Sequence, residues 1–133
     1  MREIKFRAWC ESKGRYFLTD EMVKDQFTLL PNGFFINVSG RSTTESRIFT
    51  HEEYLPEQFT GLKDKNGREI YEGDIIRFDP SGYDNHPSAS IGVVVYDDND
   101  GVFRAGDWNP SMNPDGEELT IIGNIHENQE LLR

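Results

Sequence analysis

The chain has 133 residues, of which 24 are Asp or Glu and 14 are Lys or Arg, giving a formal net charge of −10. This balance argues against a broad basic face for nucleic acid, which needs clustered Lys and Arg. No apolar run approaches the roughly 20 residues of a membrane span, and no signal-peptide apolar region follows the first charges. The single cysteine, Cys10, excludes an intramolecular disulfide and a multi-cysteine zinc site. These features predict a small, acidic, soluble domain in the cytoplasm.

The negative charge is concentrated in the second half of the chain. Residues 1–68 contain 11 basic and 10 acidic side chains, whereas residues 69–133 contain 3 and 14. Such asymmetry is typical either of an interaction surface or of a face that only keeps the protein soluble. Both interpretations stay open at the level of sequence.

The first 57 residues favour short strands. Residues 3–9 alternate in part, with Phe6 and Ala8 on one face and Lys5 and Arg7 on the other, as in a half-buried strand. The pattern then predicts a second strand that closes a hairpin, a brief helix, a third strand, and a strand end with an irregular connection interrupted by Pro56. These elements are expected at residues 15–18, 20–27, 34–38 and 48–59.

The predicted helix is short, and its expected details are specific. Asp20 is placed to cap its first turn, because a side-chain carboxylate there accepts the free backbone N–H groups. Met22, Val23 and Phe27 would form its apolar stripe.

The second part of the chain contains stronger turn signals. Asn66-Gly67 favours a two-residue type I′ turn with positive φ at both positions. We expect a further tight turn, a strand, a hairpin and a last strand, at residues 71–74, 75–78, 91–105 and 119–122. Residues 127–133 are expected to form a helical turn with Leu131 and Leu132 packed on the body. Polar loops are expected at residues 39–46, 79–90 and 109–116.

Many short strands separated by turn residues predict a mostly β fold with antiparallel strands and little helix. Residues 58–133 are expected to form a partly open, SH3-like barrel. Residues 1–57 would be an N-terminal β extension of that barrel, within one domain spanning residues 1–133.

The acidic segment around Asp98 invites comparison with a calcium loop. Aligned to an EF-hand loop, Asp98, Asp100, Gly101 and Asp107 occupy positions 3, 5, 6 and 12. Position 1 is Tyr96, which has no carboxylate, and strands rather than helices flank the segment. A solvated hairpin turn is therefore the favoured interpretation, and no metal site is predicted.

Other residue types give no catalytic constellation. The three histidines are far apart in the sequence, Cys10 has no histidine near it, and carboxylate pairs are expected by chance in so acidic a chain. Aromatic side chains in the chain are suited to stacking on bases, but core packing is the default for them. We therefore predict no catalytic residue, no cofactor and no enzymatic activity, with nucleic acid an improbable partner. The aromatic side chains suited to stacking on bases are Trp9, Tyr16, Phe17 and Trp108.

Three segments of the chain resemble the phage-associated YopX family. They are REIKFRAW, QFTGLKDKNGREIYEGDII and IIGNIHENQELL, at Arg2–Trp9, Gln58–Ile76 and Ile121–Leu132. The resemblance implies a mostly β fold, an origin in a phage or prophage, and assembly into homo-oligomers. It implies no enzymatic activity, so it transfers no catalytic residue.

The leading functional interpretation is a non-enzymatic, homo-oligomeric interaction or structural protein of undefined role. The open alternatives are an acidic binding protein or DNA mimic that acts on a basic protein partner, and a small metal-dependent hydrolase or nuclease. For the homo-oligomer, the expected interface includes Lys5, Phe6, Arg7 and Trp9, because an N-terminal strand with an open edge pairs readily with a second copy.

Overall fold

A computed structural model describes residues 3–37, 47–78, 90–105 and 119–132. The chain divides into two compact units, Ile4–Gln58 and Phe59–Arg133, the second of which also includes Met1–Glu3. We call them the N-terminal unit and the C-terminal unit. The loops expected at 39–46 and 109–116, and at 79–90 apart from Ser90, lie outside the described residues.

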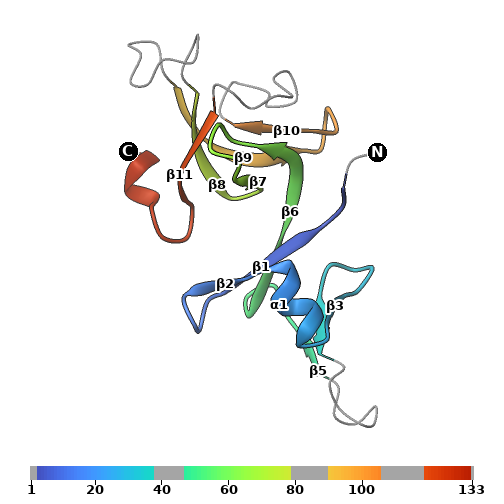
Figure 1. Ribbon diagram of the computed structural model, residues 1–133. Helices are drawn as coiled ribbons and strands as arrows, with labels where there is room; N and C mark the ends of the chain where they lie inside the picture. Colours follow the sequence, from blue (N-terminus) through green and yellow to red (C-terminus); the bar gives the residue numbers. More distant parts are fainter. Residues whose placement is uncertain (1–2, 38–46, 79–89, 106–118, 133) are drawn as a thin grey trace. The chain divides into compact units, whose positions relative to one another are not determined.

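The N-terminal unit consists of two small antiparallel groups of strands and one helix (Figure 1). In the first group β1 lies between β2 and β6, and in the second β4 lies between β3 and β5. Helix α1 connects β2 to β3. The elements of this unit are β1 (Phe6–Cys10), β2 (Arg15–Phe17), α1 (Thr19–Lys24), β3 (Phe27–Leu29), β4 (Phe35–Asn37), β5 (Arg47–Phe49) and the first half of β6 (Tyr54–Lys63).

The C-terminal unit is built on a four-stranded antiparallel sheet in the order β10-β9-β8-β11, which curls like half a barrel. A separate ladder joins β7 to the second half of β6. The elements of this unit are β7 (Glu69–Tyr71), β8 (Asp74–Phe78), β9 (Ser90–Asp97), β10 (Val102–Ala105), β11 (Leu119–Asn124) and the 3-10 turn η4 (Gln129–Leu132). The predicted mostly β fold, with a partly open barrel and little helix, is confirmed.

Each unit has its own apolar core. In the N-terminal unit Ala8, Cys10 and Phe17 pack with Met22 and Phe35. In the C-terminal unit Ile70 of β7 packs with buried residues of the curled sheet, which are Ile76, Val94, Phe103, Ala105, Leu119 and Ile121. No helix in the described part of the chain is long and apolar enough to cross a membrane.

Helix α1 differs from the prediction in its start and in its buried face. Its N-cap is Leu18, which makes no side-chain cap hydrogen bond, so the cap predicted at Asp20 is wrong. Met22 is buried, but Val23 is 72% exposed. The helix ends at Lys24, and Phe27 belongs to β3 instead. Six residues are too few to show the helical period reliably, which explains the mistaken stripe.

Strand β6 corrects the prediction of an irregular connection at residues 48–59. It continues from Tyr54 to Lys63 through Pro56, which lies opposite Ala8 of β1. A proline is accepted in a strand where its missing N–H is not needed for the ladder. The first half of β6 pairs with β1 and the second half with β7, so only one neighbour is paired at Pro56.

The turn after β6 also corrects the prediction. Gly67 has a φ of +82°, but Asn66 is not among the residues with positive φ, so the turn is not type I′. The Gly67 N–H donates to the Asp64 carbonyl at 3.0 Å, and the Asp64 N–H donates to the Arg68 carbonyl at 2.8 Å. This is a three-residue loop in which the glycine takes the left-handed position.

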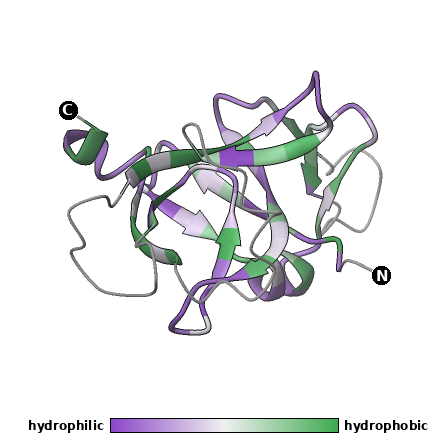
Figure 2. Ribbon diagram, turned by 90° about the horizontal axis from the view of Figure 1, so that it is seen from above, coloured by the Kyte–Doolittle hydropathy of each residue, from purple (hydrophilic) through white to green (hydrophobic). Residues whose placement is uncertain are grey.

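The C-terminal segment folds as a turn that requires a glycine. A Cβ atom at position 123 would lie 2.6 Å from Asn128 Oδ1, so the close approach needs Gly123. The same Asn128 oxygen accepts the Asn124 N–H at 3.1 Å. The predicted helical turn is confirmed as η4, which is hydrophobic in composition (the green turn beside the C-terminus in Figure 2). Leu131 and Leu132 are nevertheless exposed rather than packed.

Candidate functional site

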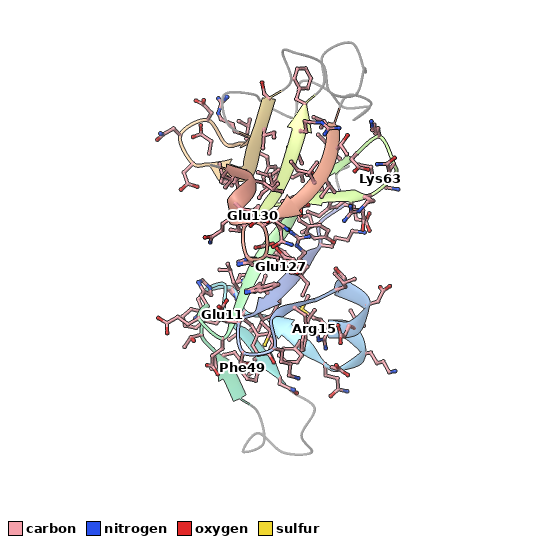
Figure 3. The ribbon with its side chains drawn as sticks, turned by 90° about the vertical axis from the view of Figure 1, so that its left-hand side faces the viewer. Glu11, Arg15, Phe49, Lys63, Glu127 and Glu130 are labelled. Atoms are coloured by element: carbon pink, nitrogen blue, oxygen red, sulfur yellow. The ribbon has the colours of Figure 1, made fainter. Side chains whose placement is uncertain are left out.

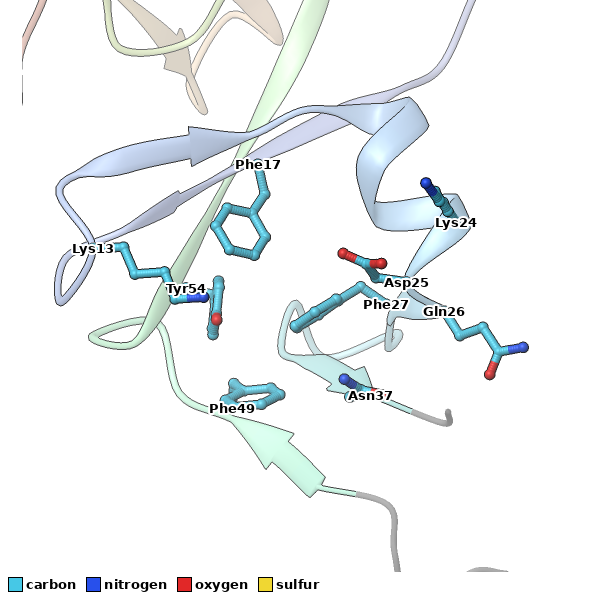
Figure 4. A pocket seen from close by; sticks show the side chains of 9 residues that line it. All are labelled: Lys13, Phe17, Lys24, Asp25, Gln26, Phe27, Asn37, Phe49 and Tyr54. Carbon is cyan, nitrogen blue, oxygen red and sulfur yellow. The ribbon is translucent and has the colours of Figure 1, made fainter. Parts of the chain in front are cut away.

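An open hollow of about 550 Å³ lies in the N-terminal unit. We call it the aromatic hollow (Figure 4). Its lining combines four aromatic rings with charged and amide side chains. The lining residues are Lys13, Phe17, Lys24, Asp25, Gln26, Phe27, Asn37, Phe49 and Tyr54.

The four rings of the hollow pack against one another. Three pairs are edge to face and two are tilted; the tilted pairs are Phe27–Tyr54 and Phe27–Phe49. Tyr54 is central, with ring centroids 5.3 Å from Phe17, 5.1 Å from Phe27 and 4.8 Å from Phe49. Phe27 and Tyr54 are half-buried, whereas Phe17 and Phe49 are buried. Edge-to-face packing of this kind fixes ring positions and leaves part of the half-buried rings facing the open side.

Short elements position these rings and their polar neighbours. Phe17 ends β2, Phe27 begins β3, Phe49 ends β5 and Tyr54 begins β6, so four strand ends converge on the hollow. Turns and strand ends are common places for binding groups, because the adjacent ladders hold them in place.

Gln26, at the edge of the hollow, has an unusual backbone conformation. Its φ is +60°, and it is the sole non-glycine residue with positive φ among the described residues. Gln26 follows the helix C-cap Asp25, and its N–H donates to the Val23 carbonyl at 3.2 Å. Glycine is the usual residue at this left-handed position after a helix.

Two basic side chains lie over the face of Phe17. The Arg15 guanidinium carbon is 4.1 Å from the ring centroid and Lys13 Nζ is 5.2 Å from it. Arg15 also forms a two-pronged ion pair with Glu21, with N–O distances of 3.1 and 2.9 Å. The hydrogen bonds of this pair lower the pKa of Glu21 and raise that of Arg15.

A second, smaller hollow of about 360 Å³ shares Phe49 and Tyr54 with the first. Its edge is acidic, with Glu11, Glu52 and Glu53. The Trp9 indole N–H donates to Glu11 at 2.7 Å, and Glu53 accepts the Thr50 N–H at 3.2 Å. Figure 3 shows Glu11, Arg15 and Phe49 together in the N-terminal unit.

The structure places the predicted interface residues on β1 and just before it. Lys5 and Phe6 are half-buried, whereas Arg7 is 8% and Trp9 is 6% exposed. Arg7 bonds Glu57 through Nε at 3.0 Å and Tyr16 through Nη2 at 3.1 Å. Of the four residues, Lys5 and Phe6 therefore keep the most accessible surface, and the predicted interface stays a prediction.

Cys10 is a buried free thiol beside these residues. Burial raises its pKa, but hydrogen bonds from Ser12, the Lys13 backbone and Tyr54 outweigh that effect, so the pKa is lowered overall. Cys10 Sγ lies 3.4 Å from Ser12 Oγ.

Exposed apolar side chains gather on the outer face of β9. Ile91 is 48% and Val95 is 49% exposed, and Val93 between them is half-buried. On the neighbouring strands Ile91 lies opposite Arg77 and Val95 lies opposite Arg104, whereas Val93 lies opposite the fully buried Ile75. Three β-branched side chains on one strand face form an apolar stripe, which we call the β9 stripe.

Several carboxylates of the C-terminal unit are used within the fold. Asp64 and Asp74 are buried and accept backbone N–H groups, as in the 2.8 Å bond from Tyr71 N to Asp74. Asp97 and Asp100 bind Arg104 in the β9–β10 turn. The segment compared with a calcium loop is thus a hairpin turn, and its last candidate ligand, Asp107, lies outside the described residues. No group of three or more potential metal ligands occurs within the described ranges.

Sequence reasoning did not identify the aromatic hollow. Its rings are separated by up to 37 positions, from Phe17 to Tyr54, and the strand beginning at Phe27 was not predicted. The signal present in the sequence is the repeated aromatic residue at the border of each short strand of the first half. Without the pairing of the strands, that signal does not show which rings meet.

Comparisons with known proteins agree with the sequence resemblance. A family model described as YopX protein matches residues 5–133, nearly the whole chain. The crystal structure of protein EF1440 from Enterococcus faecalis is similar, with a TM-score of 0.62, 28% sequence identity and coverage of 100% of both chains. No curated protein matches the chain. Because the family model covers far more than half of the sequence, this chain belongs to the phage-associated YopX protein family.

Proposed function

We propose that this protein is a non-enzymatic interaction protein that self-associates in the cytoplasm of the bacterium carrying its phage or prophage. The observation that carries the proposal is the β9 stripe, in which Ile91 and Val95 are each about half exposed. Exposed β-branched residues grouped on one strand are typical of a contact surface, whereas single exposed apolar residues need no explanation. The proposal assigns no catalytic residue and no cofactor.

A second copy of the chain is a suitable occupant of the β9 stripe. In a two-fold dimer each copy presents the same patch, so the stripe meets an identical stripe. Two apolar sheet faces pack with their side chains interdigitated, which suits Ile91, Val93 and Val95. An interface on β9 is favoured over one on β1 for two reasons. Strand β1 is central in its sheet, with a strand paired on each side. Its Arg7 and Trp9 side chains also bind partners within their own chain.

The test compares two doubly charged variants by light scattering. Ile91→Glu with Val95→Glu places two charges in the stripe, whereas Val23→Glu with Ile48→Glu adds the same charge at exposed sites in the N-terminal unit. We expect the first variant to be monomeric while the second keeps the mass of the unmodified protein. Equal masses for all three proteins would refute an interface on β9.

A second candidate function is recognition of a basic protein partner. The second, smaller hollow favours it, because Glu11, Glu52 and Glu53 line that hollow together with Phe49 and Tyr54. Aromatic rings beside carboxylates attract Lys and Arg side chains. Capture of a basic host or phage protein from infected cells, lost in a Glu11→Gln, Glu52→Gln variant, would support this candidate. Capture that persists in the variant would contradict it.

A further inference from the structure

The aromatic hollow has the size and composition of a small-ligand site. Its volume of about 550 Å³ lies within the usual range of ligand pockets, roughly 300–1,000 Å³. Such pockets combine apolar walls with a few polar groups that orient the ligand. All nine lining residues belong to the N-terminal unit, so the site does not depend on the C-terminal unit.

The walls of the hollow suit a flat ring. Phe27 and Tyr54 are half-buried and anchored by edge contacts to Phe17 and Phe49. Proteins hold unpaired bases by stacking them on such fixed aromatic rings, irrespective of the base. A flat heteroaromatic ring therefore fits these walls better than an aliphatic ligand of the same volume.

Two polar groups beside the rings match the edge of a base. Figure 4 shows the Asp25 carboxylate and the Asn37 amide on either side of Phe27. An amide both donates and accepts hydrogen bonds, and a carboxylate accepts them from an exocyclic amino group. Together they complement the mixed donors and acceptors of a nucleobase.

Two lysines supply positive charge around the rings. Lys13 comes from the β1–β2 turn, and Lys24 is the last residue of α1. Both are exposed and line the hollow. Ammonium groups bind phosphate as point charges. The net charge of −10 opposes a long polyanion, so a short anionic ligand is favoured.

Gln26 adds an independent observation. It occupies a left-handed position that glycine adopts without strain, and it lies at the rim of the hollow, with its amide extending away from the rings in Figure 4. Strained backbone positions tend to occur at ligand sites, where the side chain is needed despite its conformational cost.

From these observations we propose that the aromatic hollow binds a nucleoside phosphate, with its base against Phe27 and Tyr54 and its phosphate at Lys13, whose ammonium group lies over Phe17. Lys24, on the opposite side of the rings in Figure 4, adds positive charge at longer range. A free mononucleotide and the end of a short single strand present the same chemistry. This site goes beyond the self-association described above and is independent of it, because the β9 stripe lies in the other unit.

The test is a calorimetric titration of the full chain. The probes are AMP, GMP, CMP and UMP, a single-stranded tetranucleotide, and inorganic phosphate alone, each up to about 5 mM, which reveals millimolar affinity. Lys13→Gln with Lys24→Gln removes the two charges, and Lys63→Gln with Arg68→Gln is the matched control. Lys63 and Arg68 are exposed in the C-terminal unit (Figure 3 labels Lys63).

We expect saturable binding of at least one mononucleotide or of the tetranucleotide, weakened at least about tenfold in the Lys13, Lys24 variant and unchanged in the control. Binding of the tetranucleotide alone would identify a nucleic acid end as the source. Three results would overturn the proposal: no saturable binding, equal binding of inorganic phosphate, or unchanged affinity in the Lys13, Lys24 variant.

Gln26→Gly separates a role in binding from a role in folding. Glycine relieves the backbone strain, so we expect the melting temperature not to fall while nucleotide affinity decreases. Asn66→Gly, an amide-to-glycine change at an exposed turn in the C-terminal unit, is the control and should bind normally. Full affinity in Gln26→Gly would remove Gln26 from the proposed site.

Discussion

Asp64 joins two separate backbone segments of the C-terminal unit through one buried side chain. Its Oδ1 accepts the N–H groups of Asn66 and Arg68, both at 2.9 Å, and its Oδ2 accepts that of Ile121 at 3.1 Å. The β6–β7 turn is thereby fixed to the first part of β11. A carboxylate is suited to this position because it accepts several hydrogen bonds at once.

Replacing Asp64 by Ala should destabilise the protein by about 3 kcal/mol, because three backbone donors lose a charged acceptor in a buried place. Urea unfolding measures this loss. Asp98→Ala, at an exposed position in the β9–β10 turn, should change stability by no more than about 0.5 kcal/mol. A loss for Asp64→Ala as small as that of Asp98→Ala would contradict the role given to Asp64.

Arg7 and Glu57 form the buried ion pair of the N-terminal unit. Their side chains are 9% and 4% exposed, and Arg7 also lies over the Tyr16 ring at 3.8 Å from its centroid. A buried pair of this kind tolerates joint replacement by apolar residues better than removal of one partner.

Arg7→Met should therefore destabilise the fold by roughly 3–5 kcal/mol, since it leaves the Glu57 charge buried and uncompensated. Adding Glu57→Leu should restore most of that stability. Thermal or urea unfolding of the two single variants and the double variant gives the interaction free energy between Arg7 and Glu57. Additive losses in the double variant would show that the two side chains do not act as a pair.

At the scale of elements, the β9–β10 hairpin depends on a charged turn. Asp97 accepts the N–H groups of Asn99 and Asp100 through Oδ1 and binds Arg104 Nε at 2.8 Å through Oδ2. The Arg104 hydrogen bond is the main reason that the pKa of Asp97 lies below its ordinary value of 3.8. The contribution of this carboxylate to stability is therefore present above that ordinary value and is lost as pH falls through the folded-state pKa.

Arg104→Gln should raise the pKa of Asp97 toward its ordinary value, because the neutral amide removes the stabilising positive charge. Carbon-detected NMR titration of the carboxyl group in both proteins measures the shift. The stability lost on acidification to about pH 2 should be smaller in the variant, since less of it depends on this ionised group. An unchanged or lowered pKa of Asp97 in Arg104→Gln would refute the claim that Arg104 lowers it.

Local sequence patterns predicted the elements that are fixed by neighbouring residues. The β-branched run at residues 91–96 and the turn around Gly101 gave the β9–β10 hairpin, and residues 119–122 gave most of β11. The strand end predicted before Gly123 is wrong, because β11 continues through an irregular register to Asn124. The same patterns failed where a contact distant in sequence decides the conformation. Pro56 lies in a strand because β1 pairs with it, and Asn66 takes an ordinary φ because the Asp64 carboxylate holds the turn.

The candidate site was less predictable than the fold. The aromatic hollow depends on the meeting of Phe17, Phe27, Phe49 and Tyr54, and their contacts follow from the pairing of strands that the sequence does not reveal. The burial of Arg7 was unexpected for a similar reason. Its partner Glu57 is 50 positions away, on the strand that pairs with β1.

At the scale of the whole molecule, the charge of −10 per chain opposes self-association, so apolar burial must outweigh repulsion. An apolar contact through the β9 stripe should strengthen when NaCl is raised from about 0.05 to 0.5 M, because salt screens the repulsion. An interface that relies on Lys5 and Arg7 pairing with acidic residues should weaken instead. Sedimentation velocity at the two salt concentrations distinguishes the two interfaces.

The most direct test of the proposed self-association is the mass of the intact, unmodified protein in solution. Light scattering at about 100 µM, far above the dissociation constants of stable complexes, reports that mass without any substitution. The account predicts a multiple of the 15.4 kDa chain mass. A mass of 15.4 kDa at this concentration would contradict self-association through the β9 stripe or through any other surface.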